Sequence, residues 1–173
     1  MRLKEGRRVR GKKVEIPLAG EPLEASAVGM LRDEPARGTT LAVTWAEGGG
    51  ANAAEWIPRL KAGLPVRELE ALRHALDVPM ERLAPLLGIS RATLHRRLIS
   101  GRLDSAESDR VVRFARLLGR ATEVFESIPN GRLWLNAPQV GIGGAVPLEY
   151  AETEVGAREV EDLLGRIEFG IYS

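Results

Sequence analysis

The chain has no cysteine and no long apolar run, and each absence removes a class of protein. Without cysteine there is neither a disulfide framework nor a thiolate metal site, which fits a reducing cytoplasm. No apolar stretch approaches the ~20 residues needed to cross a bilayer. The basic start is not followed by the apolar core of a signal peptide, so secretion is not expected. We therefore expect a cytoplasmic protein that does not bind membranes.

Residues suited to catalysis or metal binding are also scarce. His74 and His95 are the only histidines, and they lie on separate predicted helices without a paired metal-ligand motif. The segment GIGG, residues 141–144, lacks the flanking residues and elements of a phosphate-binding loop. The acids near the C-terminus surround one predicted helix and do not form the facing pair that acid–base catalysis uses. The sequence therefore indicates no enzyme activity, no metal site and no cofactor.

What the chain does have is an uneven distribution of charge, although its net charge is only +1. Residues 1–13 hold seven basic side chains against one acid, and residues 91–102 hold four arginines and no acid. Residues 147–173 hold seven acids against two arginines. This distribution indicates two partner surfaces of different charge. Solvated faces that balance by chance are the alternative that charge alone leaves open.

The region from residue 66 onward predicts a mainly α-helical fold. A chain of 173 residues has room for one or two domains with a real core. Apolar residues at spacings of three and four predict a helix over residues 66–76. Asp77 and Pro79 are expected to end that helix and begin the next. Gly88 then supplies a tight turn, because glycine tolerates a positive φ.

Two further helices are predicted from their end signals. Ser90 is a natural N-cap, and Gly101 is expected to end the helix that Ser90 begins. Asp104 and Glu107 resemble a capping box at the start of a helix over residues 105–125. The side chains expected to be buried on this long helix are Val111, Phe114 or Ala115, Leu118 and Phe125.

Beyond this helix the amino-acid composition changes. Glycine and proline are dense over residues 129–150, and we expect an ordered but irregular segment in which Leu133, Trp134 and Leu135 are buried. Pro147 suits the first turn of a short helix. A last helix over roughly 154–168 carries an apolar stripe, which predicts that it docks on the rest of the fold. The stripe consists of Val160, Leu163, Leu164 and Ile167.

The N-terminal third is less informative. The segments 12–18 and 39–45 are rich enough in β-branched residues to be short strands, and the basic start suits a disordered arm. Residues 47–52, EGGGAN, form the best candidate linker. We therefore divide the chain into an N-terminal extension of uncertain structure (1–52), a DNA-binding domain (53–127) and a C-terminal domain (128–173).

Residues 83–98, LAPLLGISRATLHRRL, have the pattern of a helix-turn-helix, whose second helix lies in the major groove of DNA. Ile89 and Leu94 are expected to point inward, which leaves an outward face with arginines for guanine edges. Arg97 and Arg102 are better placed for phosphates. The predicted DNA-binding residues are Ser90, Arg91, Ala92, His95, Arg96, Arg97 and Arg102. An ordinary helical hairpin with a solvated basic face is the alternative.

Two longer segments resemble a known family. PMERLAPLLGISRATLHRRLISGRLDSAESDRVVRFARLL is similar to the helix-turn-helix half of Xre–MbcA–ParS type antitoxins. WLNAPQVGIGGAVPLEYAETEVGAREVEDLLGRIEFG resembles their C-terminal toxin-binding half, which is α-rich with an irregular Gly/Pro-rich part. The second resemblance is the more specific, because helix-turn-helix units occur in many unrelated regulators. In residues 1–50 we match no motif to the family.

The resemblance implies a partner and a mechanism. Such antitoxins are not catalysts, and they neutralise RES-type toxins, which consume NAD⁺ or transfer its ADP-ribose, by covering the NAD⁺ entrance. An acidic C-terminus with apolar side chains suits a cationic, NAD⁺-binding cleft. The predicted toxin-binding residues are Trp134, Asn136, Pro138, Arg158, Asp162, Arg166, Glu168, Phe169, Tyr172 and Ser173.

Double-stranded operator DNA is the second expected partner. One helix-turn-helix reads only a half-site, so we expect a homodimer that binds an inverted repeat and represses its own operon. A helix-turn-helix regulator whose C-terminal half dimerises or senses a ligand, without a toxin, is the alternative function.

Overall fold

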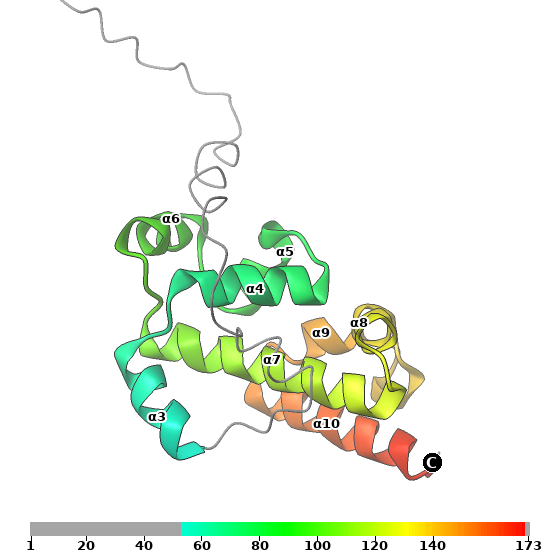
Figure 1. The fold of residues 1–173 in the computed structure, drawn as a ribbon. Helices are drawn as coiled ribbons and strands as arrows, with labels where there is room; N and C mark the ends of the chain where they lie inside the picture. Colours follow the sequence, from blue (N-terminus) through cyan, green and yellow to red (C-terminus); the bar gives the residue numbers. More distant parts are fainter. Residues whose placement is uncertain (1–52, 172–173) are drawn as a thin grey trace, which may run out of the picture. The chain divides into compact units, whose positions relative to one another are not determined.

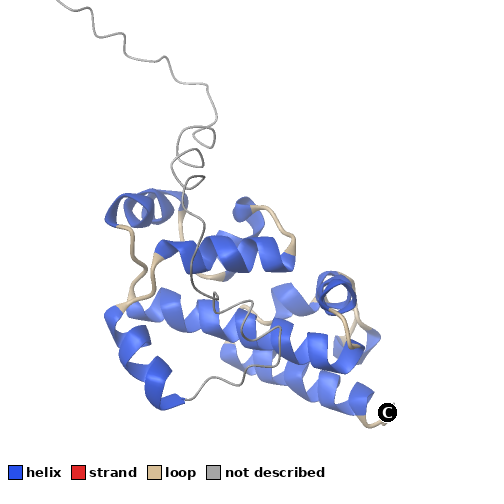
Figure 2. Cartoon of the chain, in the orientation of Figure 1, coloured by secondary structure: helices blue, strands red, loops and turns tan. Residues whose placement is uncertain are grey.

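The computed structural model describes residues 53–171, and every regular element in that range is a helix (Figures 1 and 2). The predicted strands and linker before residue 53, and the site residues Tyr172 and Ser173, lie outside the described residues. None of the helices in residues 53–171 is long and apolar enough to span a bilayer. The elements are α3 (Ala53–Ala62), α4 (Val66–Leu76), α5 (Met80–Leu86), α6 (Arg91–Ser100), α7 (Ser105–Phe125), α8 (Ile128–Asn136), the 3₁₀ turn η1 (Val140–Ile142), α9 (Pro147–Tyr150) and α10 (Glu154–Glu168).

The end signals of α4 to α7 act as the sequence predicts. Asp77 ends α4 in the left-handed region with φ 56°, and Gly88 and Gly101 take φ values of 67° and 72°. These positive φ values explain why glycine stands at both turns. The capping box of α7 is confirmed, because Asp104 and Glu107 each accept a hydrogen bond from the other's backbone N–H at 2.8 Å.

The segment after α7 is more regular than expected. Residues 128–136 form α8, with Ser127 as its N-cap and Pro129 in its first turn, where proline fits a helix. The expectation that Leu133 is buried is wrong, because 71% of its surface is exposed. Leu135 is buried, and Trp134 is half-buried with its ring 5.7 Å from the ring of Phe125. Only one face of α8 is therefore buried, where the sequence predicted an irregular segment with all three side chains buried.

Helix α3 was not predicted from the sequence. It contains Pro58, which removes a backbone donor and hides the helical signal. Trp56 packs partly against the core, and the guanidinium of Arg59 lies 5.0 Å from its ring centroid. Helix α3 therefore joins the fold through an amphipathic aromatic residue that also has a cation over its ring.

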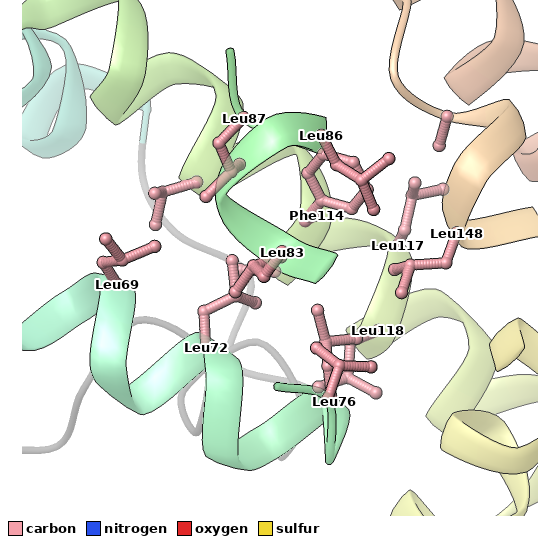
Figure 3. Packing of buried hydrophobic residues seen from close by; sticks show 14 of the residues in the cluster. Leu69, Leu72, Leu76, Leu83, Leu86, Leu87, Phe114, Leu117, Leu118 and Leu148 are labelled. Atoms are coloured by element: carbon pink, nitrogen blue, oxygen red, sulfur yellow. The ribbon is translucent and has the colours of Figure 1, made fainter. Parts of the chain in front are cut away.

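One hydrophobic cluster joins all these helices. Its central side chains come from α7, where Phe114, Leu117 and Leu118 are fully buried (Figure 3). Residues of α4 and α5 pack on one side of α7, and Leu148 of α9 belongs to the same cluster. Val160 and Leu164 of α10 are also fully buried in it, as the apolar stripe of that helix predicts. The segments before and after residue 127 thus share one core.

Three ion pairs run along the contact between α7 and α10. Arg113 pairs with Glu154 at 3.1 Å, Arg116 pairs with Glu161 at 2.7 Å, and Arg120 pairs with Glu168. The hydrogen bond to Glu168 raises the pKa of Arg120. Part-exposed pairs of this kind contribute about 0–1 kcal/mol each, whereas a fully buried leucine contributes about 1.5–3 kcal/mol. The apolar stripe therefore holds α10, and the pairs define its alignment.

Two glycines of α10 give opposite predictions. A Cβ at Gly156 would collide with the backbone carbonyl oxygen of Tyr150, whereas a Cβ at Gly165 would meet nothing within 4 Å. Gly156→Ala should lower the free energy of unfolding by roughly 2–3 kcal/mol, because the backbone at Tyr150 cannot move away from the new methyl group without strain. Gly165→Ala, the matched control, should raise it by about 0.5–1 kcal/mol. Urea unfolding followed by circular dichroism measures both, and equal effects would contradict the close approach.

Candidate functional site

The outward face of α6 is free of the core. Ser90 caps the helix by accepting a hydrogen bond from the backbone N–H of Thr93 at 3.1 Å. Leu94 and Leu98 pack partly against the core and set which side faces out. The exposed side holds five of the predicted DNA-binding residues, namely Ser90, Arg91, Ala92, His95 and Arg96. Such a face presents hydrogen-bond donors at the N-terminal half of a helix, as major-groove recognition requires.

The turn before α6 is tied to α7. Ile89 is buried, and its backbone N–H donates to the carbonyl oxygen of Ala84 at 2.9 Å. The guanidinium of Arg110 donates to the carbonyl oxygen of Leu87 at 3.0 Å and lies against Gly88. A side chain at Gly88 would displace this arginine. Periodicity alone could not identify Arg110 as a contact of the turn.

Arg97 and Arg102 are engaged within the chain. Arg97 donates to Glu107 at 2.8 Å and to Asp104 at 2.7 Å. The hydrogen bond to Glu107 raises the pKa of Arg97. Arg102 donates to the carbonyl oxygen of Gly63 at 2.6 Å, just after the C-terminus of α3. The predicted phosphate contacts of both arginines stay predictions, and neither guanidinium is without an intramolecular partner.

Asn136, one of the predicted toxin-binding residues, joins three helices. Its amide donates to the carbonyl oxygen of Leu76 at 3.2 Å, at the C-terminus of α4. Its side-chain oxygen accepts from Arg82 of α5 at 2.9 Å, and Arg82 also pairs with Glu149 of α9 at 3.2 Å. From α8, Arg132 donates to the carbonyl oxygen of Ala75 at 2.8 Å. These bonds lock α8 and α9 onto α4 and α5.

The loop after α8 is ordered by its own hydrogen bonds. The backbone N–H of Gln139 donates to Ala145 at 2.9 Å, and its side chain donates to the carbonyl oxygen of Trp134 at 3.0 Å. Pro138 is exposed, and Val140 is 95% exposed at the loop tip. The sequence predictions did not include Val140 among the exposed apolar residues. Its position beside Gly141 in a glycine-rich segment could have indicated this exposure.

The glycines of this loop serve backbone geometry. Gly143 and Gly144 both have positive φ, at 70° and 82°. The space at Gly141 is taken by Leu163 of α10, which a side chain there would strike. Within residues 53–171, no group of three or more histidine and acidic side chains is gathered as a metal site would require.

The remaining predicted toxin-binding residues lie on or after α10. Arg158 and Asp162 are exposed on that helix, and Arg166 is half-buried. Glu168 pairs with Arg120, and Phe169 follows it with 74% of its surface exposed. Figure 1 shows α10 on the side of α7 opposite α6, so the predicted toxin-binding residues of α10 lie apart from the predicted DNA-binding face.

Residues 170 and 171 leave α10 through a left-handed turn. Gly170 has φ 66°, and the backbone N–H of Ile171 donates to the carbonyl oxygen of Arg166 at 2.9 Å. This arrangement resembles the left-handed ending of many helices. Phe169 and Ile171 are both exposed large hydrophobic residues beside this turn. They form the exposed apolar end of the described chain.

Two family models match the chain in tandem. The first, described as the antitoxin Xre-like helix-turn-helix domain, matches residues 55–116. The second, described as the antitoxin Xre/MbcA/ParS C-terminal toxin-binding domain, matches residues 120–170. The two matches meet inside α7. They confirm the mainly α fold class, with a helix-turn-helix domain followed by a small α-rich domain.

Several relatives match over much of their length. "Antitoxin Xre" of Yersinia enterocolitica is 31% identical over 143 residues, which cover 80% of this chain and 97% of the relative. "Antitoxin Xre" of Photorhabdus laumondii is 31% identical over 116 residues, covering 66% of this chain and 78% of the relative. "Prs ADP-ribosylating antitoxin" of a Sphingobium species is 24% identical over 133 residues, covering 71% and 84%.

The bonds of Asn136 predict a structural contribution. Asn136→Ala should lower the free energy of unfolding by about 1–3 kcal/mol, because it leaves the C-terminal carbonyl of α4 and the guanidinium of Arg82 with fewer partners. Asn130→Ala, an exposed asparagine of the same helix, is the control and should change stability little. Thermal unfolding of the three proteins measures this, and equal stability would count against the locking role.

Proposed function

The chain belongs to the Xre family of antitoxins, and we propose that it neutralises an NAD⁺-consuming RES-type toxin and represses its own operon. Membership makes the chain an antitoxin of a toxin–antitoxin system with a helix-turn-helix DNA-binding domain and a cognate toxin. The family is not enzymatic.

The observation that carries the DNA part is the exposed face of α6. It presents Arg91, His95 and Arg96 to solvent, and an arginine on a recognition helix binds guanine O6 and N7 with two hydrogen bonds. One such helix reads a half-site, so we propose a homodimer on an inverted repeat. Repression follows if that repeat lies in the operon's own promoter.

The acidic end of the chain supports the proposal that the toxin uses NAD⁺. A toxin that uses NAD⁺ must bind an anionic dinucleotide, so its cleft needs cationic groups. The name of the Sphingobium relative refers to ADP-ribosylation, a reaction whose ADP-ribose donor is NAD⁺. We propose that the end of the chain, from Glu168 onward, enters this cleft and blocks NAD⁺.

The exposed tail supplies the contacts for that blockade. Phe169 and Ile171 are apolar and exposed just beyond α10, and aromatic anchors often dominate an interface. The outer face of α10 at Arg158, Asp162 and Arg166 would hold the toxin nearby, together with the exposed loop at Pro138. Glu168 is paired with Arg120 in the free chain, so its use by the toxin would require an exchange of partners.

Arginine substitutions on α6 test the DNA proposal. Arg91→Ala or Arg96→Ala should each weaken binding to the promoter duplex by about 1–3 kcal/mol and relax sequence preference at one position. Arg116→Ala, on the α10 side of α7, is the control and should leave binding unchanged. Fluorescence titration gives the affinity, and sedimentation of the complex gives the number of chains per duplex. Unchanged affinity in both α6 variants of folded protein would refute the groove assignment.

Removal of residues 169–173 tests the blockade. The truncated chain should still co-purify with its cognate toxin, because α10 and the loop remain. NAD⁺ turnover by the complex should return, because the part that fills the cleft is gone. Val155→Ala removes an exposed apolar side chain at the other end of α10 and should leave inhibition intact.

Three results of this experiment are distinguishable. Full inhibition by the truncated chain would refute blockade by the tail while leaving the antitoxin role untouched. Loss of co-purification would show that residues 169–173 are needed to bind the toxin, and not only to block its cleft. A cognate toxin that binds the chain but never consumes NAD⁺ would overturn the RES assignment.

A further inference from the structure

Arg97 connects the DNA-binding helix to the start of α7. Its Nε donates to Glu107 Oε2 at 2.8 Å, and its Nη2 donates to Asp104 Oδ2 at 2.7 Å. These two acids are the capping box of α7, so the same carboxylates hold the helix start and the arginine. We propose that Arg97 is a positioning residue that fixes the angle of α6 on DNA through this capping box, and that it does not bind a phosphate. The proposal rests on the DNA-binding role of α6 proposed above.

The anchoring of α6 explains why such a link matters. No side chain of α6 is fully buried, and only Leu94 and Leu98 pack partly on the core. Helix α7, in contrast, has many fully buried side chains. A helix with so shallow an apolar contact can tilt at little cost unless a directional contact resists the motion. A two-point guanidinium–carboxylate contact is directional, because both N–H bonds must be aligned.

The burial of Glu107 keeps Arg97 where it is. Only 5% of the Glu107 side chain is exposed, and its Oε2 also accepts the backbone N–H of Asp104. If Arg97 left for a phosphate, this carboxylate would lose its cationic partner while remaining buried, which is costly. The interaction of Arg97 with a solvent-exposed phosphate would be weaker than the interaction with the buried Glu107 carboxylate that it would have to give up. The sequence predicted a phosphate contact from the positive charge of Arg97, because the sequence alone did not reveal its contact with Glu107.

The two roles of Arg97 predict opposite effects of one substitution. Glu107→Gln replaces the buried carboxylate beside Arg97 by a neutral amide and so weakens this contact, while glutamine at this position still supports a capping box. If Arg97 is a phosphate contact, the change frees it and DNA binding strengthens. If Arg97 positions α6, the helix loosens and DNA binding weakens, although the protein has become more positive.

The experiment uses the full chain and a duplex selected from a random-sequence library on the wild-type protein. Arg97→Ala and Glu107→Gln should each weaken binding about tenfold, and the double variant should be no weaker than Arg97→Ala, because that change already removes the Arg97–Glu107 contact. The slope of log affinity against log salt should stay unchanged for Arg97→Ala, since a lost phosphate contact would lower it by about 0.9. Arg116→Ala and Glu161→Gln break a pair of the same residue types on the other side of α7 and are the controls.

Hydrogen exchange of the free protein supplies a readout that needs no DNA. Both variants should speed amide exchange in residues 91–100 relative to the controls, even though alanine favours the helix itself. Tighter binding by Glu107→Gln, a lower salt slope for Arg97→Ala, or unchanged exchange in α6 would each overturn the positioning role. If no duplex is selected at all, the DNA proposal fails, and exchange in α6 alone decides whether the contact orients the helix.

Discussion

The apolar packing of α7 holds the described helices together. Phe114, Leu117 and Leu118 are fully buried on it, and α3, α4, α8 and α10 all pack against this one helix. A buried leucine is worth about 1.5–3 kcal/mol, whereas each part-exposed ion pair adds about 0–1 kcal/mol. Hydrophobic burial therefore supplies the stability. The DNA-facing and toxin-facing segments depend on the same core, although they are separate in sequence.

Polar contacts add direction to this core. Asn136 joins the ends of α4 and α8 and binds Arg82 of α5, so the C-terminal segment has one orientation on the helix-turn-helix. The capping box of α7 acts in the same way on α6 through Arg97. Such contacts contribute little net energy but have strict geometry, since a buried polar group needs its partner. They determine where the exposed functional faces point.

How much the sequence predicted depends on how local the responsible signal is. Caps and spacings within one helix predicted α4 to α7 and α10, and the exposed side of α6 followed from them. Helix α8 was hidden because Pro129 and Gly131 look like helix breakers. Proline fits the first turn, and Gly131 lies where α7's backbone leaves no room for a Cβ. The partners of Arg102 lie 39 and 40 residues away in sequence, so no local pattern could reveal them.

The continuity of α7 has a consequence for geometry on a promoter. The two family matches meet within this helix of 21 residues, which spans about 30 Å without a hinge. A toxin carried by α10 would then project from the duplex in a direction fixed by the bound α6. Because DNA turns once in about 10.5 base pairs, the spacing between neighbouring sites would determine whether the carried toxins face each other or point apart. Rotational phasing along the promoter would thus matter as much as the bases that are read.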